Sequence, residues 1–161
     1  MIFSVLFFAI AGCSLVAGSV QTPELNSCSS TEEIDISDLT ISGAKIGGKF
    51  TLNFTLEVSQ ELDSDPKLEI TITREDGNKV PCFGTIGSCS YQLCEGDSTM
   101  EERLGQLWDN KCPVPEITAP VTVGSTLSPI VEFAIGKAPT TLTIELKVTD
   151  GGEPVGCVSF S

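Results

Sequence analysis

Apolar and polar residues alternate along much of the chain, which is the pattern of half-buried β-strands. The stretch 50–58 is the clearest case, because every second position in it is apolar. The same alternation recurs over 68–74, 131–135 and 142–148. We therefore predict an all-β fold, an immunoglobulin-like antiparallel β-sandwich built from short strands.

Breaks in the alternation predict bulges and turns. Ile34 and Ile36 are out of phase with Leu39 and Ile41, which indicates a β-bulge near residues 37–38. Asp-Gly at 76–77 and Asp-Gly-Gly at 150–152 are typical of tight hairpin turns. The glycine-rich stretch 43–49 matches the start of a phosphate-binding loop. However, Phe50 stands where the loop needs Ser or Thr, and a strand follows, so we interpret 43–49 as a turn.

One segment has the periodicity of a helix instead. Ser98 and Glu101 form a capping-box pattern, and a single apolar face follows them, so we predict a short helix over 98–108. The residues of that face are Met100, Leu104, Leu107 and Trp108.

Composition excludes several classes of function. The chain has 161 residues, 22 acidic against 9 basic side chains, and no histidine. The formal charge of −13 argues against nucleic acid as a partner, because phosphate binding needs clustered Lys and Arg. Without histidine, Ser-His-Asp triads and Cys/His zinc sites are impossible. We therefore expect no enzyme, no metal site and no cofactor.

The first 19 residues predict a secretory signal peptide, with the mature domain over 20–161. They are mostly apolar, their continuous apolar core is too short to span a bilayer, and small residues precede Val20. Removing them takes away Cys13 and leaves six of the seven cysteines. Six cysteines in a secreted chain indicate three disulfides, with fifteen possible connectivities. Asn53-Phe54-Thr55 is a glycosylation sequon, so Asn53 is the predicted glycosylation site.

The cysteine-containing segment 81–94, Pro-Cys-Phe-Gly-Thr-Ile-Gly-Ser-Cys-Ser-Tyr-Gln-Leu-Cys, is the most specific in the chain. Together with Cys112-Pro113 and Gly156-Cys157, it resembles the GM2 ganglioside activator branch of the ML (lipid-recognition) domain family. The Niemann-Pick type C2 sterol carriers are similar overall. They have a further cysteine pair soon after the first cysteine, which this chain lacks, and the activators have a pair that is also missing here.

The resemblance implies a secreted or lysosomal β-cup with an apolar lipid cavity and no catalytic residues. The implied disulfide pairs are Cys28–Cys157, Cys82–Cys89 and Cys94–Cys112. The implied partners are a glycolipid, phospholipid or sterol, a transiently contacted membrane surface, and a lysosomal glycosidase that receives the lipid. Two alternatives to the activator-like function stay open: a sterol carrier, and a secreted protein-binding sandwich with a solid core.

Eleven apolar residues are candidates for the lipid site. Seven are predicted to line the cavity: Phe50, Phe54, Ile70, Ile72, Phe133, Ile144 and Leu146. The four apolar residues of the predicted helix, Met100, Leu104, Leu107 and Trp108, are expected near its mouth.

Overall fold

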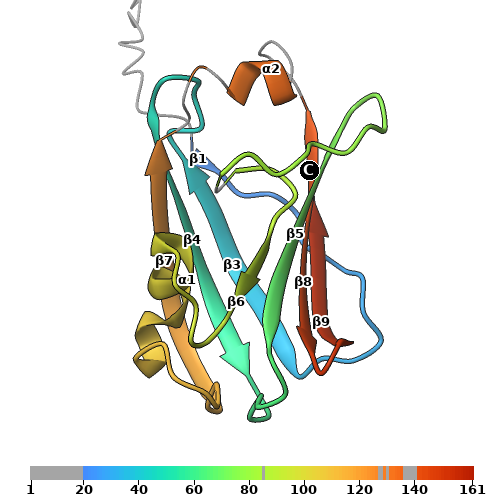
Figure 1. The fold of residues 1–161 in the computed structure, drawn as a ribbon. Coiled ribbons are helices and arrows are strands. Elements are labelled where there is room, and N and C mark those ends of the chain that lie inside the picture. Colours follow the sequence, from blue (N-terminus) through green and yellow to red (C-terminus); the bar gives the residue numbers. More distant parts are fainter. Residues whose placement is uncertain (1–19, 85, 127–128, 130, 136–140) are drawn as a thin grey trace, which may run out of the picture.

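The structure, a computed structural model, describes residues 20–84, 86–126, 129, 131–135 and 141–161. The expected signal peptide, 1–19, lies outside these residues. Two antiparallel sheets pack face to face, which confirms the predicted all-β sandwich (Figure 1). In order across the first sheet lie β1 (Val20–Gln21), β3 (Ile34–Ser42), β4 (Lys49–Val58) and β7 (Ile117–Thr126). In order across the second lie β2 (Asn26–Ser27), β9 (Glu153–Phe160), β8 (Leu142–Asp150), β5 (Lys67–Arg74) and β6 (Ser90–Gln92).

The register puts the apolar members of each alternating pattern on the inner faces. Ile72 pairs with Ile144 across β5 and β8. Leu52 pairs with Val123 across β4 and β7. The buried apolar residues form two clusters in the interior of the sandwich. The first contains Ile34, Val58, Leu62, Leu93, Cys94, Trp108, Val114, Val148 and Val155, and the second contains Ile36, Leu39, Leu146, Val158 and Phe160.

The predicted turns and bulge are present. The β3–β4 register shifts between Ser37 and Thr40, as the phase change of the apolar residues indicated. The stretch 43–49 is a turn, as predicted. Gly43 has a φ of 71°, and a Cβ added there would lie 2.5 Å from the Lys49 carbonyl oxygen, so only glycine fits. Gly151 and Gly152 form the β8–β9 turn.

The strand expected over 131–135 is wrong, because this segment is the short helix α2 (Val131–Ile135). A short apolar run cannot be assigned to a strand or a helix by periodicity alone. The strand β7 is missing from the prediction, because Pro120 and Gly124 interrupt its pattern. Proline is tolerated there because β7 is an edge strand of the first sheet.

The predicted helix is confirmed as α1 (Thr99–Leu104), continued by the 3₁₀-helix η1 (Gly105–Trp108). The capping box is complete. The Ser98 hydroxyl accepts from the Glu101 backbone N–H, and the Glu101 carboxylate accepts from the Ser98 N–H.

The two sheets meet at backbone distance where β3 and β9 lie next to each other. The Glu33 N–H donates to the Val155 carbonyl at 3.0 Å. At Gly156, an added Cβ would lie 2.5 Å from the Ile34 carbonyl oxygen and 2.8 Å from the Ile34 Cβ. We call the end of the sandwich that holds this contact and the β8–β9 turn the closed end. The open end is opposite and carries the β3–β4 turn and α2 (Figure 1).

Replacing Gly156 with alanine should destabilise the protein, because the added methyl group pushes the sheets apart. We expect a loss of about 1–3 kcal/mol, or about 3–10 °C in Tm. Gly124→Ala is the matched control, since its Cβ meets only the Phe50 carbonyl oxygen, at 3.8 Å. Thermal unfolding measures both variants, and equal Tm values would contradict the importance of the contact.

Candidate functional site

Toward the open end, part of the inner surface of the sandwich is incompletely buried, although Phe160 of β9 is buried there. Central strands of a solid sandwich bury their inward-facing side chains completely. Here Ile144 of β8 remains half-buried although β5 and β9 flank it on both sides, and further inward-facing side chains of β4 and β5 are half-buried as well. They include five of the predicted lining residues: Phe50, Phe54, Ile70, Ile72 and Ile144. Leu146, two residues after Ile144 on β8 and paired with Ile70, is buried.

A small cavity continues from this region toward the closed end. Its volume is about 40 Å³, and its wall is almost entirely apolar. Of the predicted residues, Phe54, Leu104 and Trp108 line it. The alternation of β3, β4, β5 and β8 could have identified most of the others, but the strand β7 was not foreseen. These others are Ile34, Ile36, Leu56, Val58, Leu68, Leu93, Val114, Val121 and Val148.

Segment 94–112, which we call the strap, closes one side of the sandwich. It contains α1 and η1, and the Cys94–Cys112 disulfide joins its ends. On the β6 side, the Trp108 Nε1–H donates to the Leu93 carbonyl at 2.7 Å, and the Glu101 carboxylate accepts from the Gln92 N–H at 2.8 Å. The strap is therefore hydrogen-bonded to the second sheet, and its Leu104 and Trp108 line the cavity together with Val121 of the first sheet.

Three predicted residues lie neither on the cavity wall nor on the inner faces of the sheets. Met100 is half-buried on α1, and Leu107 is 41% exposed on η1. Phe133 is 90% exposed, so the prediction that it lines the cavity is wrong. The reason is the local fold: the segment is a helix at the open end and not an inward-facing strand.

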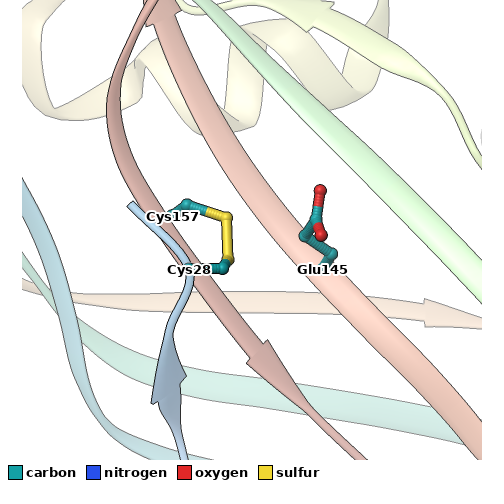
Figure 2. A group of neighbouring side chains, drawn as sticks. All are labelled: Cys28, Glu145 and Cys157. Atoms are coloured by element: carbon teal, nitrogen blue, oxygen red, sulfur yellow. A yellow bond between two sulfur atoms is a disulfide. The ribbon is translucent and has the colours of Figure 1, made fainter. Parts of the chain in front are cut away.

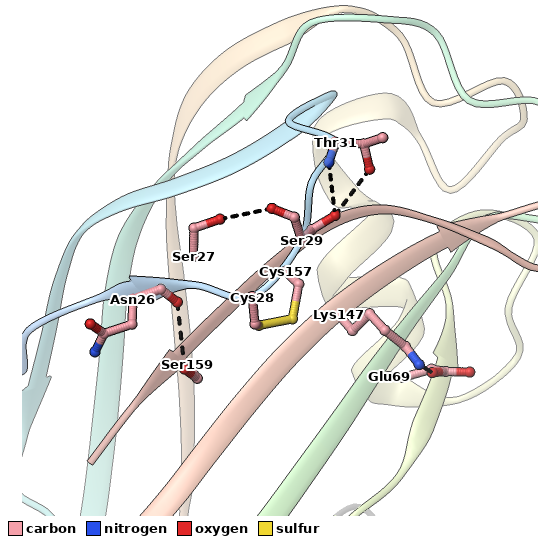
Figure 3. Close-up of a disulfide and its surroundings, with 9 residues drawn as sticks. All are labelled: Asn26, Ser27, Cys28, Ser29, Thr31, Glu69, Lys147, Cys157 and Ser159. Carbon is pink, nitrogen blue, oxygen red and sulfur yellow. Dashed lines mark hydrogen bonds and ion pairs between the residues drawn. A yellow bond between two sulfur atoms is a disulfide. The ribbon is translucent and has the colours of Figure 1, made fainter.

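The N-terminal segment closes the opposite side of the sandwich. It pairs first with β3 through β1 and then with β9 through β2. The Cys28–Cys157 disulfide and a hydrogen bond from the Cys28 N–H to the Cys157 carbonyl hold it on the outer face of β9 (Figure 3). The Thr31 hydroxyl adds a bond to the Pro154 carbonyl at 2.8 Å. This side is fixed covalently and by backbone hydrogen bonds.

The structure contains the three disulfides that the resemblance implies. Besides Cys28–Cys157 and Cys94–Cys112, Cys82–Cys89 closes a loop whose Phe83 is 61% exposed. This loop lies toward the open end, since Val80 just before it bonds to the Ile72 carbonyl.

A group of possible metal ligands does not form a metal site. The ligand atoms of Cys28, Glu145 and Cys157 lie within 4.8 Å of one another on the outer face of the second sheet (Figure 2). Cysteine binds metals as a thiolate, and both sulfurs here are joined in a disulfide.

Two titratable groups, Glu101 in the strap and Tyr91 just before it, have shifted pKa values. Hydrogen bonds, first from the Gln92 backbone N–H and then from the hydroxyl and backbone N–H of Ser98, lower the pKa of Glu101 below its ordinary value of 4.5. Burial raises the pKa of Tyr91, and the nearby Glu101 charge adds to this shift. Glu101 also borders an acidic cleft of about 630 Å³ with Asp63, Asp65, Glu95 and Asp97.

The sequon residue Asn53 lies on the outer face of the first sheet. Its side-chain oxygen accepts a bond from the Thr122 hydroxyl of β7 at 2.8 Å. No helix within the described residues is long and apolar enough to cross a bilayer.

The architecture is that of a two-sheet sandwich of the Niemann-Pick type C2 kind. A solved Niemann-Pick type C2 protein from the Japanese carpenter ant is similar to this chain, with a TM-score of 0.51 and 15% sequence identity. The match covers 85% of this chain and 96% of the ant protein. No protein-family model and no curated protein matches the sequence. The likeness therefore concerns the fold alone.

Replacing Glu101 with glutamine should loosen the strap, because the carboxylate accepts from two backbone N–H groups. We expect a loss of about 1–2 kcal/mol in urea unfolding at pH 7. Because the folded-state pKa is lowered, this stabilisation is complete above about pH 4.5 and is lost as the pH falls through the folded-state value. The difference between the proteins should therefore shrink in acid.

Glu102→Gln is the control for this variant, since Glu102 is exposed on the same helix. If both substitutions cost the same at pH 7, the carboxylate of Glu101 has no special role in holding the strap.

Proposed function

We propose that the protein is a non-enzymatic lipid-binding and lipid-transfer protein. The observation that carries the proposal is the set of half-buried apolar side chains on central strands of both inner faces. Such a surface between two sheets offers an apolar ligand an environment shielded from water. The apolar cavity beyond Phe54 extends it.

Transfer without catalysis suits this arrangement. Burial of a methylene is worth about 0.8 kcal/mol, so a sixteen-carbon chain is held in a bilayer by about 13 kcal/mol. A protein that offers a comparable apolar environment lowers the cost of extraction. The cavity of about 40 Å³ is far smaller than ligand pockets of about 300–1,000 Å³, so a bound chain also occupies the open end or widens the cavity.

The ligand within this class is a glycolipid or phospholipid, presented to a lysosomal glycosidase in the manner of the ganglioside activators. The resemblance of the cysteine-containing segment 81–94 supports this choice. A sterol carrier is the second candidate, and the likeness of the fold to a Niemann-Pick type C2 protein favours it. The half-buried inner faces argue against a protein-binding sandwich with a solid core.

We further propose that residues 1–19 are a signal peptide, that 20–161 form the mature domain, and that the protein is secreted or lysosomal. Three disulfides support an oxidising compartment. Asn53 on the outer face is accessible from outside the sandwich, which suits a glycan.

Lipid should be recovered from the purified protein by solvent extraction, or bind when supplied as labelled lipid. Ile72→Asp, which puts a charge on the half-buried inner face, should lower this binding by about tenfold or more. Thr73→Asp on the outer face of the same strand is the control. The proposal is refuted if no lipid co-purifies with the protein and no labelled glycolipid, phospholipid or sterol binds to it.

The open end should contact the membrane during transfer. Phe133 on α2 and Phe83 on its disulfide-closed loop are both exposed, and aromatic side chains favour the bilayer interface. Replacing either with serine should slow transfer between vesicles by about tenfold, since burial of a phenylalanine is worth at least about 1.5 kcal/mol.

Leu107→Ser is the control for membrane contact, because Leu107 is exposed on the strap and away from the open end. Equal transfer rates for all three variants would contradict docking through the open end.

A further inference from the structure

The strap lies beside β7 of the first sheet, and we call the boundary between the two the slot. Leu104 and Trp108 of the strap and Val121 of β7 line the cavity from the two sides of this slot. One hydrogen bond crosses it, from Arg103 Nη1 to the Gly124 carbonyl of β7 at 2.9 Å. Within the described part of the chain, no other side-chain hydrogen bond or ion pair joins the strap to β7.

Of the two sides of the sandwich, the side at the strap and β7 is held by fewer bonds, so it widens more easily. On the opposite side, β3 and β9 meet at Ile34 and Gly156, and the N-terminal segment is bonded to both sheets. The Cys28–Cys157 disulfide fixes that segment to β9. The cavity of about 40 Å³ is too small to hold a whole acyl chain, and the side with the fewest bonds moves most easily to widen it.

Arg103 has the chemistry of a headgroup ligand. It is exposed, and it forms no ion pair with any described carboxylate, although the chain has 22 acidic residues. A guanidinium has five N–H donors in a planar fork that matches carboxylate and phosphate oxygens. Its place in the last turn of α1 is electrostatically favourable, but that does not explain why it reaches across to β7.

We propose that an acyl chain enters the cavity through the slot between the strap and β7, and that Arg103 binds the anionic carboxylate or phosphate headgroup of that lipid. The inference rests on the proposed lipid-binding function and adds a route and a ligand class to it. When the slot opens, Arg103 exchanges the Gly124 carbonyl for the headgroup, so its N–H donors stay bonded.

Trp108 provides the measurement, since it is the only tryptophan, is 8% exposed and lines the cavity. Lipids with a brominated chain quench tryptophan fluorescence on contact. Four probes with a dibrominated stearoyl chain separate the possibilities: phosphatidylglycerol, phosphatidylcholine, free stearate and its methyl ester. We expect the phosphatidylglycerol and the free acid to quench at concentrations about tenfold lower than phosphatidylcholine, whose choline cation balances its phosphate, and the uncharged methyl ester.

Arg103→Met should remove this preference, Arg103→Lys should keep part of it, and Lys111→Met, a matched loss of charge elsewhere in the strap, should keep all of it. If Arg103→Met unfolds, as judged by circular dichroism, the preference of the wild-type protein and of Arg103→Lys decides. A preference for phosphatidylglycerol alone assigns the site to phosphate, and one for stearate alone assigns it to carboxylate.

Equal quenching by all four probes, or an unchanged preference in Arg103→Met, would overturn the role of Arg103. Lipid transfer without any quenching of Trp108 would overturn the slot as the route. Both results leave the proposed lipid-binding function intact, whereas the absence of lipid binding in every assay would remove that function as well.

Discussion

The closed end of the sandwich depends on one contact between backbones, that of Ile34 with Gly156. Because Gly156 has no side chain, the Ile34 carbonyl occupies space that any other residue would need for its Cβ. The sheets are thus held at one corner at a separation too small for interleaved side chains. Twisted sheets that start from such a corner diverge along their strands, which leaves several of the apolar inner residues near the open end half-buried.

Two different segments of the chain close the two sides of the sandwich. On one side, the N-terminal segment pairs with an edge strand of each sheet and is fixed by a disulfide. On the other side, the strap is bonded firmly to the second sheet through Trp108 and Glu101 but touches the first through Arg103. The two sides of the sandwich therefore differ in how firmly they join the two sheets. This difference gives the protein a stable frame together with one side whose opening breaks few bonds.

The strands and the strap could be predicted from the sequence better than the residues that line the interior between the sheets. Alternation identifies the inner face of β4, and the capping box of Ser98 and Glu101 identifies α1, because both are local patterns. The position of Phe133 could not be inferred, since five residues carry too little periodicity to separate helix from strand. The divergence of the sheets depends on the contact at Gly156, between residues far apart in the chain, and no local pattern reveals it.

The edge position of β7 has a consequence for self-association. An edge strand offers unpaired backbone groups to any other strand, and β7 is ten residues long. The strap lies beside it, and Pro120 removes one donor from its backbone. Any movement that uncovers β7 therefore also exposes an edge on which a second molecule can add a strand. If ligand exchange uses the proposed opening, the time that the strap spends away from β7 affects both ligand exchange and aggregation.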